Sequence, residues 1–547
     1  MSQFGHSSMS KTSDRQEKLV KDLTSTVVIE KSKLIPRSDP SQRRIYWLNR
    51  LKVKREDGTE EELRPTPEVI AVAIAKCSRM DTAFDQNVDD VPLKKAAEFH
   101  EKWVVGYGHS SVAEHATSSV AIENVSQVVT KIMEDSRLAS YTEKSSRYQV
   151  FTRDRTVTPS SIKNSQLAQD YEQVIDKLYS LYEELRTPIA ELMKERFVKS
   201  EEVSDRGYEA QIKARTFDVV RCLLPAASTT SFGMTCNARV WEHVISKLLS
   251  HPLEEANTVG QELLNALKGG PELDPDVALA ERPHPILLKY ATTKPYLRET
   301  FEDITKIAQE LFTQNSSDQT ISEATLSRPV VLLYDDCKAE TRVAAALLSR
   351  VSDRAYGEII HRIKDDRALV ERILETALLK RGSHDQPIRE LEHATFSHEI
   401  VMDYGAWRDI QRHRMCTQTN QTLGITLGYD LPEEIQTVGY ADRFHTMMHE
   451  VTRMHEHLIQ EGLVHEAEYI VPMAYRRRLF VTWNLRELFH FIELRSGIKG
   501  HPSYRRIAQE TWRTLEQTHP FLAKFIRVDL RGDEASVSTI GSKPKGI

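Results

Sequence analysis

The chain has 547 residues and a formal net charge of −6 at pH 7, a size that allows roughly two to four domains. This charge gives no sign of the basic face typical of nucleic-acid-binding proteins, and no run of about 18 apolar residues predicts a membrane span. Five scattered cysteines without Cys-x-x-Cys spacing argue against a disulfide framework or a zinc ribbon. The polar N-terminus lacks the apolar core of a secretory signal, so the sequence favours the reducing cytoplasm.

The first half of the chain predicts an arm followed by a mixed helix-and-strand domain. Residues 1–40 are rich in Ser, Lys and Asp and predict a mobile arm. We expect a first domain over 44–279. Within it, apolar residues recur at helical spacing in three stretches, 66–79, 91–107 and 166–194. The alternating small, polar and β-branched residues after position 114, and those of 229–235, predict strands.

The second half predicts a bridge, a second domain and a loose tail. Residues 280–330 read as a polar, helical bridge. A second domain is expected over 331–530, beginning near a short apolar run at 329–334 that suits a buried strand. Residues 479–483 are also strand-like, and the Gly/Ser/Lys-rich tail 531–547 is expected to be loose. Long helices around a small mixed sheet in each domain predict an α+β fold.

The two predicted domains share short sequence motifs, which indicates a duplication. Glu-His-Ala-Thr stands at 114–117 and again at 392–395. Asn-x-Arg stands at 237–239 and again at 484–486. A period this long indicates a duplicated domain and not a solenoid of short repeats. The duplication therefore directs attention to a site shared between copies.

Two polar clusters are candidates for binding an anion. Arg412-His413-Arg414 concentrates cations within one helical turn, and arginine forks bind phosphates and planar carbonyl edges in a bidentate way. Ser140–Tyr148 offers hydroxyls and one arginine. Taken alone, each pattern more often means a solvated basic face or an ordinary Ser/Thr loop. No His-Glu-x-x-His, Walker loop or Gly-x-Gly-x-x-Gly is present, so neither a metal site nor a Rossmann-type cofactor site is predicted.

The ordered series of these motifs resembles the flavin-dependent thymidylate synthases. The series is Gly-His-x-Ser…Glu-His, Arg-His-Arg, Ser-x-Arg-Tyr, Arg-x-x-Leu-Pro and Asn-x-Arg, and it covers roughly 44–270 and 331–530. The resemblance implies methylation of dUMP to dTMP with methylenetetrahydrofolate as carbon donor and FAD, reduced by NADPH, as hydride source. It also implies a tetrameric arrangement with active sites at subunit interfaces, which a homodimer of this duplicated chain would mimic as a pseudo-tetramer.

The resemblance implies roles for particular residues. It assigns catalytic roles to Arg412, His413 and Arg495. It assigns dUMP contacts to Glu143, Lys144, Ser145, Arg147, Tyr148, Arg221, Arg412 and Arg495. It assigns FAD contacts to Ser78, His109, Ser111, Glu114, Asn237, Arg239, Arg412, His413, Arg414, Asn484, Arg486 and His490.

Each copy departs from the family pattern in a different place. The first copy has Asp135-Ser136-Arg137 where the family has Arg-His-Arg, and Leu248 where the base-contacting arginine is expected. The second copy has Gly424 and Glu468 at two phosphate-side arginine positions. The losses are complementary, so we expect one composite site built from both copies and an abolished mirror site. The sequence leaves open whether the halves come from one chain or from two.

Other interpretations remain open at this stage. The chain could be a decayed, non-catalytic homologue that binds flavin or nucleotide in a structural or regulatory role. It could also alkylate a different uridylate, since Lys144 and the Thr417–Thr422 run depart from the family. Tyr475-Arg-Arg-Arg478 is expected to be a solvent-exposed turn.

Overall fold

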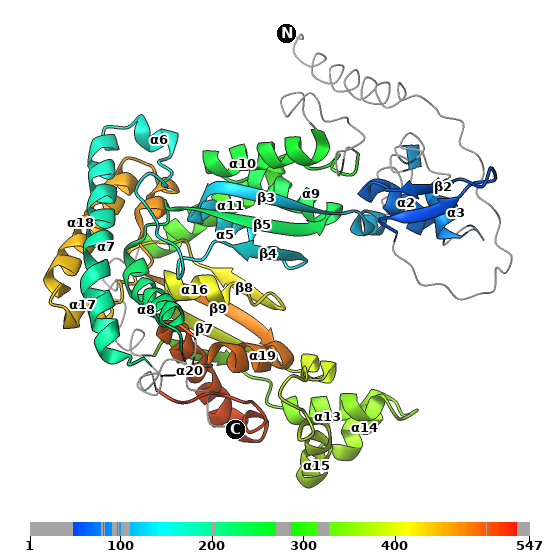
Figure 1. The fold of residues 1–547 in the computed structure, drawn as a ribbon. Helices are drawn as coiled ribbons and strands as arrows, with labels where there is room; N and C mark the ends of the chain where they lie inside the picture. Colours follow the sequence, from blue (N-terminus) through cyan, green and yellow to red (C-terminus); the bar gives the residue numbers. More distant parts are fainter. Residues whose placement is uncertain are drawn as a thin grey trace. The chain divides into compact units, whose positions relative to one another are not determined.

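The computed structural model of the chain describes residues 48–77, 80, 83–89, 96, 98–99, 110–199, 201, 203–269, 284, 286–313, 328–498 and 500–532. The predicted arm, Ser78, His109, most of the predicted helix 91–107 and residues 533–547 lie outside these ranges. The fold is α+β and contains two tandem copies of one domain (Figure 1). The chain divides into two compact units, one of 1–123, 138–143 and 231–309, the other of 124–137, 144–230 and 310–547.

The first unit begins with a hairpin and two helices. Strands β1 (Leu51–Lys54) and β2 (Glu60–Leu63) pair antiparallel. Helix α2 (Pro67–Lys76) begins with proline at its first position, and the Thr66 side chain accepts a hydrogen bond from the Val69 amide at 3.3 Å. This combination of cap and proline fixes the start of a helix. Helix α3 (Phe84–Asp89) follows.

The rest of the first unit is a small sheet with helices. The sheet has the order β3-β5-β4, with β3 (Thr117–Ser126), β5 (Thr229–Asn237) and β4 (Ala139–Glu143). The 3₁₀ turn η2 (Ser110–His115) precedes β3. Helices α9 (Ala238–Leu249), α10 (Glu254–Leu264) and most of α11 (Pro295–Thr313) complete the unit, with a π turn at η4 (Asn265–Gly269).

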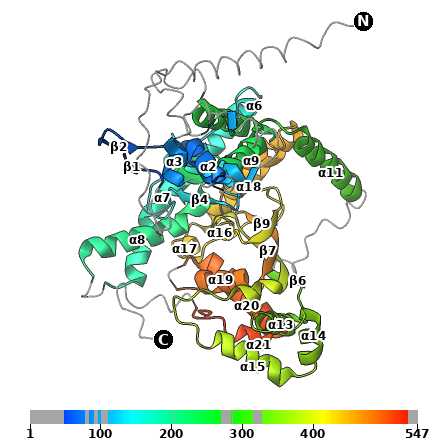
Figure 2. The same ribbon diagram turned by 90° about the vertical axis from the view of Figure 1, so that its right-hand side faces the viewer.

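The second unit contains a four-stranded antiparallel sheet of order β6-β7-β9-β8. Three of these strands, β6, β7 and β9, are labelled in Figure 2. Its strands are β6 (Val330–Tyr334), β7 (Thr395–Asp403), β9 (Arg476–Asn484) and β8 (Cys416–Asn420). The second copy also contributes α13 (Ala339–Ser349), α14 (Tyr356–Ile363), α15 (Arg367–Leu378), η6 (Arg389–His393), α16 (Tyr404–Ile410), α17 (Glu433–Thr437), α18 (Ala441–Gln460), η7 (Glu466–Ile470), α19 (Leu485–Arg495), α20 (Pro502–Thr518) and α21 (Pro520–Ala523).

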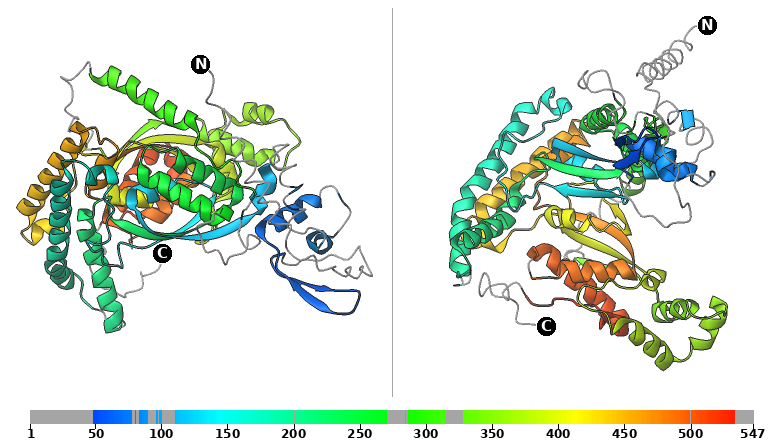
Figure 3. Two further views of the ribbon diagram at one scale, coloured as in Figure 1. Left: turned by 90° about the horizontal axis from the view of Figure 1, so that it is seen from above. Right: turned by 45° about the vertical axis from the view of Figure 1, so that its right-hand side comes forward.

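Part of the first copy belongs to this second unit. It supplies α5 (Gln127–Met133), α6 (Ser160–Lys163), α7 (Ala168–Arg196), α8 (Asp205–Val220) and η3 (Arg221–Leu223). Helix α7 packs beside its second-copy counterpart α18, as Figure 3 shows from two sides. The pairing joins the two copies within one compact unit.

The two copies meet around a local two-fold axis. Pro225 and its counterpart Pro472 form an antiparallel bridge. On one side of this bridge the Ala227 amide donates to the Tyr469 carbonyl, and on the other the equivalent Ala474 amide donates to the Cys222 carbonyl, both at 2.8 Å. Reciprocal bonds of this kind define an isologous interface. Here that interface is folded into a single chain.

Several sequence expectations are confirmed and three are corrected. The strands expected at 329–334 and 479–483 are β6 and β9, and the helix expected at 166–194 is α7. The sheet of the second unit is antiparallel and not mixed. The Ser140 segment begins as a strand, β4, because Tyr and Thr suit a pleated surface. Residues Arg476–Arg478 lie in strand β9 and not in a turn. No helix among the described residues is long and apolar enough to cross a membrane.

Candidate functional site

The Arg412-His413-Arg414 segment follows directly from strand β7 and helix α16. Asp403 ends β7 and caps α16, because its carboxylate accepts a hydrogen bond from the Ala406 amide at 2.8 Å. The helix ends just before the segment. Arg412 is exposed, His413 is buried, and Arg414 donates to the Arg137 carbonyl at 2.9 Å. The three side chains therefore point into different surroundings.

His413 is held by hydrogen bonds at both ring nitrogens. Nδ1 lies 2.9 Å from a Glu487 carboxylate oxygen, and Nε2 lies 2.9 Å from Nε of Arg495. Burial, followed by the nearby charge of Arg495 and by His490, lowers the pKa of His413 well below its usual value. The imidazole is therefore neutral at physiological pH. The Phe491 ring packs edge-on against the His413 ring, with the two ring centres 5.1 Å apart.

Arg495 ends helix α19 and is braced from several directions. Nη2 donates to the Asp409 carbonyl at 2.7 Å, and Nη1 donates to the Asp409 carboxylate at 3.3 Å. The guanidinium carbon lies 5.3 Å from the centre of the Tyr504 ring. Burial disfavours ionisation of Asp409, but Arg221, Arg495 and other arginines together hold its pKa below its usual value. Asp409 is therefore an anion among arginines from both copies.

Arg221 brings a first-copy cation into this group. It begins η3, directly after helix α8, and is 5% exposed. Its Nη2 atom is buried and has no hydrogen-bond partner among the described residues. Burying a guanidinium N–H without an acceptor is costly. Arg221 therefore has a buried donor that no described residue satisfies, near the Asp409 carboxylate.

Arg147 lies on the same side of the second unit. Its Nε and Nη2 donate to the two Asp218 carboxylate oxygens at 2.7 and 2.6 Å, and its amide donates to the Ser145 hydroxyl at 3.2 Å. Burial acts to lower the pKa of Arg147, but Asp218 and then Tyr504 raise it. Tyr504 thus interacts with both Arg147 and Arg495. Arg147 and Arg221 of the first copy and Arg495 of the second copy therefore belong to one compact unit.

The remaining predicted dUMP contacts surround Arg147 in the sequence. Ser145 is half-buried and Tyr148 is exposed. The Lys144 ammonium lies 5.6 Å from the centre of the Phe151 ring, and burial, with a smaller effect of Arg155, lowers its pKa. Glu143 ends strand β4 in the other compact unit.

The predicted FAD residues fall into two equivalent groups. In the first unit Arg239 pairs with Glu114, and in the second unit Arg486 pairs with Glu392 at 3.0 Å. The repeated Glu-His-Ala-Thr and Asn-x-Arg motifs therefore meet through their Glu and Arg. Ser111 is exposed in η2.

The repeated asparagines also have a structural role. Asn237 caps α9 by accepting from the Val240 amide at 3.0 Å, and Asn484 caps α19 by accepting from the Glu487 amide at 2.9 Å. The His490 ring lies 5.4 Å from that of His413. The caps fix where helix α19 begins, and so where Glu487 and Arg495 lie.

In the second copy, where the abolished mirror site is expected, an arginine lies near Glu468 and stacks on an aromatic ring. The guanidinium carbon of Arg477 lies 4.1 Å from the centre of the Trp407 ring. The Trp407 and Tyr404 rings are stacked, with their centres 5.6 Å apart. Glu468 stands where the first copy has Arg221, and burial raises its pKa although Arg477 opposes this. Asp135 also acts on the charge of Arg477. Arg477, stacked on an aromatic ring, thus lies beside the Thr417–Thr422 run, where it donates to the Gln421 carbonyl.

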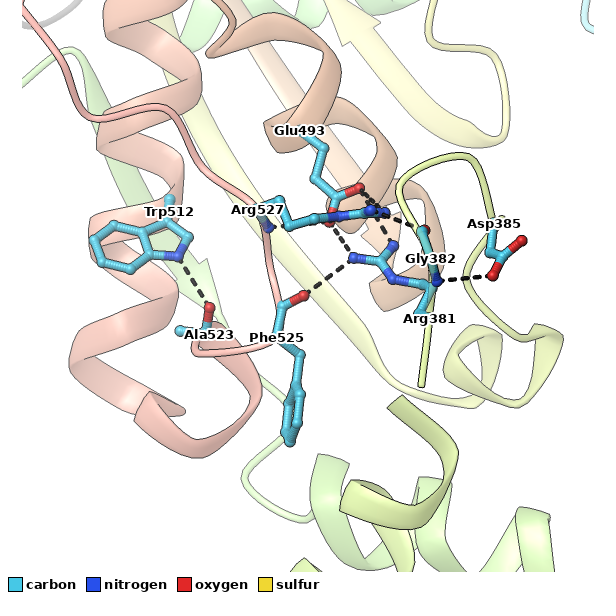
Figure 4. Close-up of polar contacts among 8 residues, drawn as sticks. All are labelled: Arg381, Gly382, Asp385, Glu493, Trp512, Ala523, Phe525 and Arg527. Atoms are coloured by element: carbon cyan, nitrogen blue, oxygen red, sulfur yellow. Dashed lines mark hydrogen bonds and ion pairs between the residues drawn. The ribbon is translucent and has the colours of Figure 1, made fainter. Parts of the chain in front are cut away.

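A cluster of charged side chains holds Glu493 in the last turn of helix α19 (Figure 4). Arg381 forms an ion pair with Glu493 and donates to the Phe525 carbonyl at 3.1 Å. The Arg527 amide also donates to Glu493 at 3.0 Å, and its side chain donates to the Gly382 carbonyl at 2.9 Å. The cluster ties Arg381 and Gly382 to Glu493 in the last turn of α19, two residues before Arg495.

Sequence reasoning missed the acids that hold the arginines. These are Asp409, which holds Arg495, and Asp218, which holds Arg147; Glu487, which holds His413, and the aromatic Tyr504 were missed as well. A signal was present, because Asp218 and Asp409 each stand three residues before a predicted arginine, one helical turn away. The partners they actually hold are distant in sequence, so the spacing alone would have misassigned them. Among the described residues, no group of three or more His, Cys, Asp or Glu could hold a metal ion.

Comparison with known proteins gives matches over both copies. A family model described as thymidylate synthase complementing protein matches residues 61–269 and 332–521. A protein named UPF0159 from Chlamydia muridarum is 31% identical over 458 residues, covering 80% of this chain and 82% of that protein. A UPF0159 protein from Thermoplasma acidophilum is 26% identical over 501 residues, covering 84% and 95%. A flavin-dependent thymidylate synthase from Thermococcus kodakarensis is 30% identical over 192 residues, covering 34% and 69%.

Proposed function

The chain belongs to the thymidylate synthase complementing protein family, and on that premise we propose that it methylates dUMP to dTMP at one composite site. Methylenetetrahydrofolate is the carbon donor, and FAD reduced by NADPH is the hydride source. The first copy contributes the phosphate side of the site, and the second copy contributes the base side. One chain then carries one site, and a homodimer would have two.

The buried Nη2 of Arg221 is the observation that carries this proposal. A phosphate dianion would supply the acceptor that this group lacks. Arg147 would add a second guanidinium, and the Ser145 hydroxyl a neutral donor. Charge-assisted bonds from two arginines suit a doubly charged phosphate better than a single bond does.

The base side would stabilise charge that develops on the pyrimidine ring. Addition of hydride at C6, or activation of C5 toward carbon, builds negative charge on the uracil. Arg412 and Arg495 are the two cations that the second copy offers. Arg495 is already oriented by Asp409, so its charge is preorganised before the ring reacts.

The predicted flavin residues fit the cofactor by their chemistry. The Arg239 side chain is 55% exposed and lies beside Glu114, so its guanidinium is accessible to a diphosphate. Ser111 adds an accessible hydroxyl. When bound, the flavin would supply the redox chemistry, and the chain would hold and orient it.

The contents of the mirror position support a single site per chain. A nucleotide phosphate there would meet the Glu468 carboxylate in place of an arginine. It would also compete with Arg477, which already stacks on Trp407. Like charges at short range and the loss of this stack both oppose binding.

One observation favours a second candidate, a non-catalytic nucleotide-binding homologue. Arg147 is paired with Asp218 and Arg495 with Asp409. Those carboxylates compete with a ligand for the same guanidinium groups. A protein in which they never release their arginines would bind weakly and would not turn over.

Purified protein distinguishes the two candidates. The proposal predicts yellow protein with flavin absorbance, and release of tritium from C5-labelled dUMP when methylenetetrahydrofolate and NADPH are present. A protein that takes up FAD and dUMP but releases no tritium supports the non-catalytic candidate. A colourless protein that refuses added FAD contradicts both.

A further inference from the structure

We propose that His413 is a positioning residue that acts as a hydrogen-bond acceptor for Arg495 and thereby aims the guanidinium at the pyrimidine ring. This inference rests on the proposed function. It differs from the family-based expectation, in which His413 contacts the flavin. It adds Glu487 as the group that sets the state of the imidazole.

The geometry assigns a direction to each hydrogen bond. Arginine Nε can only donate, so Nε2 of His413 must accept from it across the 2.9 Å contact. The imidazole proton is then on Nδ1, where the Glu487 carboxylate accepts it across another 2.9 Å contact. A carboxylate on one nitrogen of a neutral histidine fixes which tautomer is present.

Burial and the cations beside the ring favour a neutral histidine, and the two carboxylates beside the ring oppose this. Arg495 and His490 come from α19, Asp409 comes from α16, and Glu487 is at the start of α19. Protonation of Nε2 would remove the acceptor from Arg495 and set two cations against each other. The ring is 3% exposed, so solvent would not screen that repulsion.

The first copy supplies an internal comparison. Three positions in it correspond to His413, Glu487 and Arg495, and they are occupied by Ser136, Val240 and Leu248. The copy that lacks the arginine therefore also lacks its acceptor and the carboxylate behind that acceptor. If His413 and Glu487 served only to pack α19, their loss need not accompany that of Arg495. The three residues change together, as expected for one functional unit.

The network gives each of the three guanidinium nitrogens of Arg495 a hydrogen-bond partner. Its Nη2 donates to the Asp409 carbonyl, and Nε donates to His413. These two bonds fix the plane of the guanidinium. Small errors in placing a catalytic cation cost about 10²-fold in rate.

The test compares two replacements of His413. In His413→Gln the amide oxygen can still accept from Arg495, whereas His413→Leu keeps the volume without an acceptor. We expect His413→Leu to lower kcat for tritium release about 10²-fold with a smaller change in KM for dUMP, and His413→Gln to recover most of that loss. The matched control is His398→Gln, since His398 is also buried and also bonded at both ring nitrogens, to Trp483 and Thr514.

A second readout does not depend on activity. The ¹⁵N shifts of the histidine ring in the intact protein should show a protonated Nδ1 and a bare Nε2 at His413, and Glu487→Leu should disturb this state. Wild-type kcat in His413→Leu, equal losses in the two variants, or a proton on Nε2 would each overturn the inference. If wild-type protein releases no tritium, the proposed function fails, while the ring shifts still decide whether His413 is an acceptor.

Discussion

Replacing Arg221 with methionine should weaken nucleotide binding far more than it weakens the fold. Arg221 is 5% exposed, and its Nη2 has no hydrogen-bond partner in the part of the chain that the structure describes. A charge-assisted hydrogen bond contributes about 1.5–3 kcal/mol, and about 1.4 kcal/mol corresponds to tenfold in affinity. We therefore expect the Kd for dUMP to rise about 10- to 100-fold.

The effect on stability should be small because two contributions oppose each other. Methionine removes the attraction between Arg221 and Asp409, which destabilises the folded state. It also removes a buried donor that lacks an acceptor, whose desolvation costs about 1–3 kcal/mol. The free energy of unfolding of the protein without nucleotide should change by less than about 1.5 kcal/mol.

The matched control is another buried arginine whose bonds are satisfied. Arg55 is 3% exposed and is paired with Glu61 and Asp89. Breaking such a pair costs about 3 kcal/mol, so Arg55→Met should destabilise the protein and leave dUMP affinity unchanged. Calorimetric titration with dUMP and denaturant unfolding measure both quantities. Wild-type dUMP affinity in Arg221→Met would refute the assignment of Arg221 to the phosphate.

Three further predictions follow from other contacts. Arg147→Ala should raise KM for dUMP about 10²-fold, while Arg153→Ala, at a more exposed ion pair with Glu172, should not; equal KM values would contradict the phosphate role. Glu340 and Asp335 raise the pKa of His519 against the opposing effect of burial; the stability this provides is complete below the ordinary histidine pKa and is lost as pH rises through the raised one. Wild type should therefore lose stability relative to His519→Gln as the pH rises above about 6.5, the ordinary histidine pKa, and parallel curves in denaturant unfolding would exclude the effect. Arg477→Met should lower the free energy of unfolding by about 1–2 kcal/mol without changing the number of dUMP molecules bound per chain in titration. Binding of a second dUMP per chain by this variant would contradict the prediction, because it would show that the Arg477 side chain alone keeps nucleotide out of the mirror position.

Much of the architecture could be predicted because it depends on local patterns. Helical spacing over 166–194 and the apolar run at 329–334 each correspond to one described element, α7 and β6. Duplication was visible because the copies keep the residues that build turns and caps. Asn237 and Asn484, which the family resemblance assigns to the flavin, both cap helices, since a short polar side chain satisfies the first free amides of a helix.

The strand containing Arg476–Arg478 could not be predicted from composition. Three successive arginines indicate solvent, but β9 lies between β7 and β8 and its pairing is decided by distant partners. Arg476 is held by Asp430, and Arg477 by the Trp407 ring. Tertiary contacts of this kind override the local preference of the sequence.

The candidate site was predictable as a list of cations and not as a network. The complementary pattern of Asp135, Glu468 and their intact counterparts indicated two half-sites. It gave no information on Asp218, Asp409 or Glu487, because each pairs with a residue tens of positions away in the chain: Arg147, Arg495 and His413 respectively. Asp218 and Asp409 orient their arginines, and these pairs form only when distant parts of the same copy fold together.

The central claim, that both halves of one site come from one chain, is tested most directly by mixing two inactive proteins. Arg221→Met removes the phosphate side and Arg495→Met removes the base side. Because Arg221 and Arg495 belong to the same compact unit of a single chain, an equimolar mixture should bind no more dUMP with wild-type affinity, and release no more tritium, than either protein alone. Recovery of dUMP binding and activity in the mixture would show that the halves come from different chains and would contradict the account.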